Sequence, residues 1–391
     1  MERIGIYGGT FNPPHIGHIQ AAEWAVKTLK LNRLLLIPDR VAPHKKIPAG
    51  SPTPEQRLEM LGIAAAGAEK IQVSDLELRR DGTSYTCETV TQVRELYPEA
   101  KLFLLMGTDM FLSCSTWRHP EMILEHAELA VIYRGDRDEI AAVSRCKSDM
   151  EARGAKVVLI ENPVVPISST QLRRMLIFQC ATPFLPRGVG EYIQDNGMYG
   201  TDRSYVNLPP DALETTVVSL LNPNRVKHVL GCRDTAVVLA KKWGADVTDA
   251  ARAGLLHDIT KALDGPLQLT LCAEYGTILD DFGAQNPKTL HALTGSLVAE
   301  RIFGENEQVV RAIRWHTTGK AGMNLLEKII YVADYMEPNR DFPGVERLRE
   351  LAFSDIDGAL RLGLEMTLAH LRAQGSQVSP KSREALAYMN R

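Results

Sequence analysis

The pattern of apolar residues changes near residue 200, and this change limits the folds that are open to the chain. Before it, apolar runs at residues 4–7, 33–37, 101–106, 129–133 and 156–160 alternate with segments of helical spacing, including 21–31, 53–66 and 87–96. Such alternation predicts a parallel sheet flanked by helices. After residue 210, nearly every segment repeats its apolar positions at intervals of three and four residues. The second half is therefore predicted to be all-α.

A linker is expected between the two patterns. Residues 197–210, GMYGTDRSYVNLPP, are rich in glycine, proline and polar side chains and have no periodic apolar pattern. The length of 391 residues also favours two or three domains, at roughly 150 residues per domain. We therefore expect an α/β domain over 1–200, a linker over 201–210 and a helical domain over 211–391.

Composition excludes several classes of protein. With 45% hydrophobic and 24% charged residues the chain is typical of globular proteins, and its formal charge of -3 does not suit a protein that coats nucleic acid. It has no apolar stretch of about 18 residues that could span a bilayer, and no apolar run of a signal peptide at its start. We expect a cytoplasmic protein without nucleic-acid or membrane partners. The 6 cysteines have no CxxC pairing and are expected to be reduced.

The first strand leads into a glycine-rich turn, GGTFNPPHIGH, at residues 8–18. Glycines allow the backbone to approach a ligand closely, and the prolines precede a helix whose first amides can hold an anion. His15 and His18 are three residues apart, so both imidazoles can face one phosphate. The alternative is an ordinary strand-turn-helix with two half-buried histidines.

A second candidate phosphate element, ISSTQLR, occupies residues 167–173. It follows a proline and precedes a helical segment, so its hydroxyls and amides face one way and Arg173 follows one turn later. The alternative is a capping box formed by Ser168 and Gln171.

The two elements together resemble a known family. The string at 8–18 resembles the signature of the HIGH-type nucleotidyltransferase superfamily. With IPDRVAPHKK (37–46), SPTPEQRLEML (51–61), SDLELRRDGTSYTCET (74–89), MGTDMFLSCSTWRHPEMI (106–123) and ISSTQLR, it is similar to bacterial nicotinate-mononucleotide adenylyltransferase. The resemblance implies a Rossmann-like sheet that transfers AMP from ATP to nicotinate mononucleotide, giving deamido-NAD and pyrophosphate, with Mg²⁺ on the phosphates.

The resemblance also assigns roles to residues. No Ser-His or Cys-His nucleophile pair accompanies these motifs, so we expect direct attack by the mononucleotide phosphate, with catalysis by positioning and charge stabilisation. The catalytic residues are then His15, His18 and Arg173. The ATP-binding residues are Gly8, Gly9, Thr10, Phe11, His15, His18, Gly107, Asp109, Ser168, Ser169, Thr170 and Arg173.

Further residues are candidates for the mononucleotide and the ribose. Asp109 follows the predicted strand 101–106, at an end where α/β sheets place ligands, although a helix N-cap is the alternative. Tyr85 and Trp117 offer flat faces to a pyridine ring, and Lys45 offers a charge to a phosphate or carboxylate. Together with Thr86 they form the predicted mononucleotide site. The sequence leaves the choice between nicotinate and nicotinamide mononucleotide open.

The helical half carries an ordered set of polar residues on apolar segments. They are His228, His257, Asp258, His291, His316 and Asp334, and the pair His257–Asp258 is expected on a helix. Buried structural histidines could account for one or two of them, but each would need its own partner. Six donors exceed what one catalytic ion takes from a protein. We therefore predict two divalent metals about 3.5–4 Å apart, bridged by Asp258, which is the candidate catalytic residue of this half. His228, His257 and Asp334 would bind one metal, and His291 and His316 the other.

This set resembles the HD phosphohydrolase superfamily. RVKHVLG (225–231), AGLLHDITK (253–261), NPKTLHALTG (286–295), IRWHTTGKAGM (313–323) and LEKIIYVADYMEPNR (326–340) are similar to bacterial HD-domain symmetric dinucleoside-tetraphosphate hydrolases. The resemblance implies a di-iron centre that cleaves diadenosine tetraphosphate to two ADP, although Mn, Co or Zn suit the donors equally. Lys261, Thr317, Lys320 and Arg340 are the candidate phosphate contacts, with surface salt bridges as their alternative.

The chain is thus predicted to be a bifunctional enzyme whose partners are small nucleotides. For the helical half, two alternatives stay open: a regulatory module that binds a nucleotide, and a phosphohydrolase acting on another nucleotide. Homo-oligomer formation and communication between the two sites are also left open by the sequence.

Overall fold

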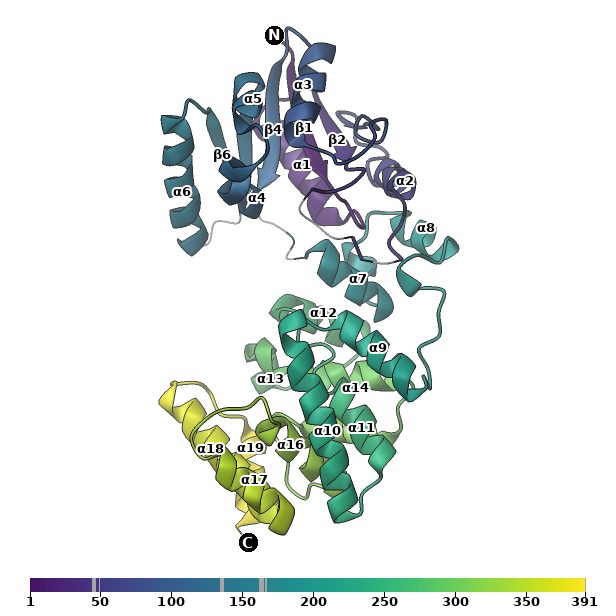
Figure 1. The fold of residues 1–391 in the computed structure, drawn as a ribbon, viewed down its shortest axis with the longest axis vertical. Helices are drawn as coiled ribbons and strands as arrows, with labels where there is room; N and C mark the ends of the chain where they lie inside the picture. Colours follow the sequence, from purple (N-terminus) through teal and green to yellow (C-terminus); the bar gives the residue numbers. More distant parts are fainter. Residues whose placement is uncertain (44–46, 49, 134–136, 162–164, 166, 391) are drawn as a thin grey trace. The chain divides into compact units, whose positions relative to one another are not determined.

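The computed structural model describes residues 1–43, 47–48, 50–133, 137–161, 165 and 167–390. Their contacts fall into two compact units, Met1–Arg203 and Ser204–Arg391 (Figure 1). None of the described helices is both long and apolar enough to cross a membrane.

The first unit is built on a six-stranded sheet in the order β3-β2-β1-β4-β5-β6, with every neighbouring pair parallel. The strands are β1 (Arg3–Gly9), β2 (Arg33–Pro38), β3 (Ile71–Val73), β4 (Lys101–Gly107), β5 (Ala127–Tyr133) and β6 (Val157–Glu161). Successive strands run outward from β1 to β3, and the chain then returns to the centre with β4. The strand order therefore reverses between β1 and β4, where open α/β sheets form their ligand crevice.

Helices cover both faces of this sheet because its central strands are apolar on both sides. In β4, Leu102, Leu104 and Met106 join the core under α3 (Thr86–Leu96), α4 (Thr108–Ser113), α5 (Pro120–His126) and α6 (Arg137–Ala152). Phe103 and Leu105 join the opposite core under α1 (Ile16–Thr28) and α2 (Pro54–Ala64). The unit continues with α7 (Ser169–Ile177) and α8 (Val189–Asp195).

The second unit is helical, and none of the described residues from 204 to 390 lies in a strand. Its helices are α9 (Pro210–Leu220), α10 (Val226–Trp243), α11 (Val247–Leu256), α12 (Gly265–Glu274), α13 (Asp281–Gln285), α14 (His291–Arg301), α15 (Glu307–Trp315), α16 (Leu325–Met336), α17 (Val345–Ser354), α18 (Ile356–Ala373) and α19 (Pro380–Met389). Helix α10 packs against α11 and α16, and α15 packs against α11, α14 and α16. This packing brings the predicted metal ligands together. The predicted fold class is confirmed in both halves.

The segment 197–210 packs at both ends. Met198 and Tyr199 are buried in a short 3₁₀ turn, and the Tyr199 hydroxyl donates to Asn12 Oδ1 at 2.7 Å. Beyond the unit boundary, the Asn207 amide donates to the Phe303 carbonyl at 3.0 Å. Each end of the segment is therefore held by its own unit, because its aromatic and amide groups find partners there.

Candidate active sites

A cavity of about 540 Å³ opens at the carboxyl ends of the central strands of the first unit. Many of the residues predicted for ATP and the mononucleotide line it: Gly8, Gly9, Thr10, Phe11, His18, Tyr85, Thr86, Gly107, Trp117, Ser169, Thr170 and Arg173. His15, Ser168 and Asp109 are not among its lining residues, and Lys45 lies outside the described residues. The cavity thus joins motifs that are more than 150 residues apart in the chain.

Direct hydrogen bonds tie the two predicted phosphate elements to each other. Arg173 Nη1 donates to the Asn12 carbonyl at 2.6 Å, and Ser169 Oγ donates to the Pro13 carbonyl at 3.0 Å. Ser168 caps α7 by accepting the Gln171 amide at 3.2 Å. The capping box weighed against a phosphate role is therefore present, and it starts the helix that presents Ser169 and Arg173 to the turn.

His15 and His18 face each other instead of standing side by side on one helical face. His15 has an extended backbone and is the N-cap of α1, and its ring stacks on His18 with centroids 3.6 Å apart. The His15 amide donates to His18 Nδ1 at 3.1 Å. His15 is 7% exposed, and burial lowers its pKa to about 4, so the ring is neutral near pH 7. A Cβ at Gly17 would meet His15 Nδ1 at 3.0 Å, so this glycine leaves space for the His15 ring.

The predicted mononucleotide residues lie around the start of α3 and the turn after α4. Tyr85 is the N-cap of α3, and Thr86 is the first residue of that helix. The Arg118 guanidinium lies 4.4 Å from the Tyr85 ring centroid, and Arg118 and Trp117 both line the cavity. Asp109 is exposed in the first turn of α4, whose N-cap is Gly107, so the N-cap alternative does not describe this carboxylate.

In the second unit, the predicted metal ligands converge from five segments. His228 lies on α10 and Asp334 on α16, while His257 and Asp258 follow α11, His291 begins α14 and His316 follows α15. The pair His257–Asp258 was expected on a helix, but α11 ends at Leu256. Both residues lie in the turn that follows it, and both are buried.

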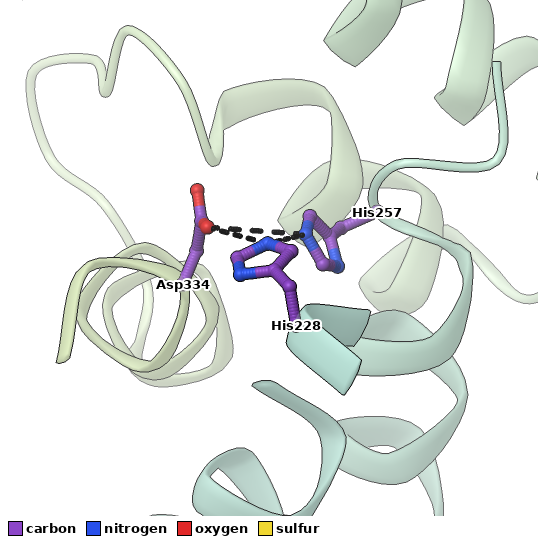
Figure 2. A group of neighbouring side chains, drawn as sticks. All are labelled: His228, His257 and Asp334. Atoms are coloured by element: carbon purple, nitrogen blue, oxygen red, sulfur yellow. Dashed lines mark hydrogen bonds and ion pairs between the residues drawn. The ribbon is translucent and has the colours of Figure 1, made fainter. Parts of the chain in front are cut away.

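One group of this centre consists of His228, His257 and Asp334 (Figure 2). His228 Nε2 lies 3.1 Å from Asp334 Oδ1 and 3.2 Å from His257 Nε2, and His257 Nε2 lies 3.9 Å from Asp334 Oδ1. Three donor atoms of the types that divalent transition metals take thus point to one small volume.

A second group of donors surrounds Asp258. Its Oδ1 lies 3.4 Å from His291 Nε2 and 3.7 Å from His316 Nε2, while its Oδ2 lies 3.5 Å from His257 Nε2. Asp258 Oδ1 is buried and has no hydrogen-bond partner among the described residues. A buried carboxylate oxygen without a donor is costly, and a cation at this position would satisfy it. The residues therefore fit a divalent metal.

The electrostatics of the group favour ionised carboxylates. Burial raises the pKa of Asp334, but the hydrogen bond with His228 and the charge of His257 outweigh it and hold that pKa well below its usual range. Burial likewise raises the pKa of Asp258, and its histidine neighbours lower it further than burial raises it. Both carboxylates are thus available as anionic ligands.

The four predicted phosphate contacts of this half divide into two sets. Lys261 Nζ lies 3.1 Å from His291 Nε2, Arg340 donates to Asp334 Oδ1 at 2.7 Å, and Thr317 Oγ1 lies 3.2 Å from His316 Nε2. These three border the centre. Lys320 instead pairs with the buried Glu327 at 3.4 Å, so an ion pair, the alternative weighed against a phosphate contact, is present at this residue.

Comparison with known proteins agrees with the division into two halves. The Cytidylyltransferase-like family matches residues 6–175, and the HD domain family matches residues 225–339. A protein of Pseudomonas syringae pv. tomato named "Probable nicotinate-nucleotide adenylyltransferase" is 37% identical over 210 residues, which cover 51% of this chain and 94% of that protein. One of the same name from Borreliella burgdorferi is 34% identical over 198 residues, covering 50% of this chain and 96% of that protein.

The chain belongs to the nicotinate-nucleotide adenylyltransferase family through its N-terminal half. Its C-terminal half carries an HD domain. Among solved structures, a Clostridium acetobutylicum protein described as a "predicted HD superfamily hydrolase involved in NAD metabolism" is 38% identical. The match covers 47% of this chain and 97% of that protein, with a TM-score of 0.46.

In the adenylyltransferase half, sequence reasoning missed Arg57. This arginine is 0% exposed, and its guanidinium donates to the Thr10 carbonyl at 2.6 Å, the Asp39 carbonyl at 2.6 Å and Asp39 Oδ1 at 3.1 Å. Arg57 thus holds the backbone of the glycine-rich turn by a hydrogen bond from the protein interior. Its position on the apolar face of α2, beside buried Met60 and Leu61, was the available signal.

In the HD domain, sequence reasoning missed two charged residues. Arg225 Nε donates to Asp258 Oδ2 at 2.6 Å, and Glu337 Oε1 lies 3.1 Å from His228 Nδ1. Each lies within three residues of a predicted ligand in the sequence, but only the packing of α10 against α16 and the turn after α11 shows what they contact.

Proposed function

We propose that the N-terminal half transfers the adenylyl group of ATP to nicotinate mononucleotide. The observation that carries this proposal is the cavity in which the glycine-rich turn and α7, tied together by Arg173 and Ser169, meet the aromatic residues Tyr85 and Trp117. Groups that can bind phosphate lie on the turn and on α7, and aromatic rings that can stack on a base or a pyridine lie at Tyr85 and Trp117. A dinucleotide product contains both phosphates and flat rings, so it matches this lining.

The reaction requires no covalent intermediate with the protein. An oxygen of the mononucleotide phosphate attacks the α-phosphorus of ATP, the bond to the β-phosphate oxygen breaks, and pyrophosphate leaves. Because His18 Nδ1 accepts the His15 amide, its proton resides on Nε2, which can donate to the charge that develops on the α-phosphate. Arg173 and the backbone amides of residues 8–11 would add donors, and Mg²⁺ would neutralise the phosphates.

His18→Ala tests this assignment. The loss of one donor to the developing charge is expected to lower turnover with ATP and nicotinate mononucleotide by about 10²–10³-fold. His370→Ala, at an exposed histidine of the second unit, is the matched control. Turnover of His18→Ala near that of the control would refute the role of His18, and absence of turnover in the natural protein with either mononucleotide would refute the function.

For the HD domain, we propose hydrolysis of diadenosine tetraphosphate to two ADP at a two-metal centre. The convergence of four imidazoles and two carboxylates, with the buried Asp258 Oδ1 left without a donor, carries this part. His228, His257 and Asp334 would hold one metal, His291 and His316 the other, with Asp258 between them. Iron is the first candidate, and the donors suit Mn, Co or Zn as well.

The charged residues around the centre suit a polyphosphate. Bound metals would supply Lewis acidity at the phosphate that is attacked by water. Lys261, Arg225 and Arg340 each lie beside a candidate metal ligand, so their positive charges border the same volume. A single water molecule is consumed, and the central P–O–P bridge breaks to leave two equal nucleotides.

The test is to load the full chain with Fe²⁺ or Mn²⁺ and to supply diadenosine tetraphosphate. We expect about two metal ions per chain and ADP as the only nucleotide product. Fewer than one ion per chain together with no ADP would favour the nucleotide-binding module. Release of ATP and AMP, or turnover of a different nucleotide alone, would instead favour another phosphohydrolase.

A further inference from the structure

The histidines of the HD domain differ in what holds their outer nitrogen atoms. His257 Nδ1 lies 2.8 Å from the Gly254 carbonyl and His316 Nδ1 lies 2.7 Å from the Ile313 carbonyl, both within their own helical turn. His228 Nδ1 lies 3.1 Å from a carboxylate oxygen, Oε1 of Glu337. An ionised carboxylate only accepts hydrogen bonds, so His228 donates its Nδ1 proton to Glu337. With a metal bound, the Nε2 of His228, beside Asp334 and His257, would then offer its lone pair to the ion.

Glu337 is itself fixed from two sides. It is 1% exposed, directly follows α16, and its Oε2 accepts the Asn339 amide at 2.8 Å and Asn339 Nδ2 at 2.7 Å. The two carboxylate oxygens of Glu337 thus make different contacts. Oε2 anchors the carboxylate to its own turn, and Oε1 reaches across to α10.

Helix α10 accommodates this carboxylate through a glycine. A Cβ at Gly231 would collide with Glu337 Oε2 and would lie 3.0 Å from Asn339 Nδ2. Gly231 lies inside α10, and glycine within a helix costs stability relative to alanine, so its presence there calls for a reason. The close approach of Glu337 is the contact that requires it.

We propose that Glu337 is a positioning residue that sets the metal affinity of the HD domain by orienting His228. The proposal rests on the proposed metal-binding function of this domain. A carboxylate on the far nitrogen fixes the ring and raises the basicity of the ligand nitrogen, and loss of such partners weakens metal binding by about 10–100-fold. The carbonyl partners of His257 and His316 lack a full negative charge.

Glu337→Gln in the full chain tests the proposal with Mn²⁺ alone as the probe. Titration calorimetry is expected to show Mn²⁺ binding that is weaker by about 10–100-fold. Metal retained after dialysis should fall accordingly. The Mn²⁺ concentration that gives half-maximal ADP release should rise by the same factor, which a general loss of folded protein would not cause.

Glu305→Gln is the matched control. Glu305 is also a buried carboxylate of this unit, and it pairs with Arg252 at 2.7 Å without contacting a candidate ligand. It should lose stability but keep the Mn²⁺ affinity of the natural protein. Gly231→Ala, which displaces Glu337 while leaving the carboxylate in the chain, gives a second route if Glu337→Gln does not fold.

The outcomes separate this inference from the function on which it rests. Natural protein that binds Mn²⁺ while Glu337→Gln and Gly231→Ala bind it equally well would overturn the role of Glu337 alone. An equal loss of affinity in Glu305→Gln would do the same, because the effect would then follow stability. Natural protein that binds no Mn²⁺ would overturn the metal-dependent function itself.

Discussion

At the scale of single residues, His15 illustrates how a motif residue can act through its neighbour. It does not line the cavity, yet its backbone amide and its ring both contact His18, which does. Its burial keeps it neutral, so the stacked pair carries at most one positive charge beside the cavity. In the proposed reaction, His18 alone would then donate to the phosphates, and His15 would hold the His18 ring in place.

Protonation of His15 should make the fold sensitive to acid. Its pKa is about 4 in the folded chain against 6.5 when unfolded, so below pH 6.5 the unfolded chain takes up the proton first and stability falls towards pH 4. Between pH 7 and pH 4.5 the natural protein should lose about 2–3 kcal/mol more than His15→Gln. Urea unfolding at the two pH values measures this difference, and equal losses in both proteins would contradict it.

Some site residues could be recognised from the sequence alone, and others could not. The glycine-rich turn could be found in the sequence because glycines, prolines and two histidines follow an apolar run directly. The six metal-ligand candidates could be found because histidine and aspartate are unusual in apolar helical segments. Arg57, Arg225 and Glu337 could not be assigned, because their partners are remote: Glu337 contacts His228 across 109 residues and Arg57 contacts Thr10 across 47. The charge of these three residues alone does not indicate which partner each of them contacts.

At the scale of elements, helix α2 is joined to the site by one side chain. Arg57 is a buried arginine on a helix that otherwise packs apolar residues against the sheet, and its fork reaches the turns after β1 and β2. The helix is held in register by Thr53, whose hydroxyl accepts the Gln56 amide at 3.2 Å in a capping box. The Thr53 cap fixes the start of α2, and the Arg57 guanidinium then holds the glycine-rich turn through the Thr10 carbonyl.

Arg57→Met is expected to be strongly destabilising. It leaves Asp39 buried without its cation, and breaking a buried ion pair costs about 3–5 kcal/mol. The KM for ATP should rise as well, because the Thr10 carbonyl loses its support. Urea unfolding and steady-state kinetics check both effects against Arg79→Met, which removes an exposed pair with Asp75 and should change neither. A stable variant with unchanged KM would contradict this account.

The predicted elements were most accurate where burial is continuous. Five strands could be found because their apolar runs are covered on both faces, whereas β3 (Ile71–Val73) was missed: it is a three-residue edge strand with an exposed middle residue. Helix α1 begins at Ile16, just after the two prolines that were expected to precede a helix. The helical apolar spacing was recognised only from residue 21, although Ile19 already packs against the core on that face of the sheet.

At the scale of the whole molecule, the two units have separate cores and proposed sites with different ligands. Calorimetry of the full chain should therefore show two unfolding transitions. ATP with Mg²⁺ should raise the midpoint of one, and Mn²⁺ the midpoint of the other, because each ligand stabilises only the unit that binds it. A single transition that both ligands shift equally would contradict independent units.

The reversal of strand order between β1 and β4 also bears on how this half tolerates changes in length. The crevice is formed by the two innermost strands, while β3 and β6 are each two strands away from it. Insertions or deletions next to these edge strands would alter the outline of the sheet and leave the distance across the crevice unchanged. Changes in length can thus accumulate at the margins of the sheet while the crevice at its centre keeps its geometry.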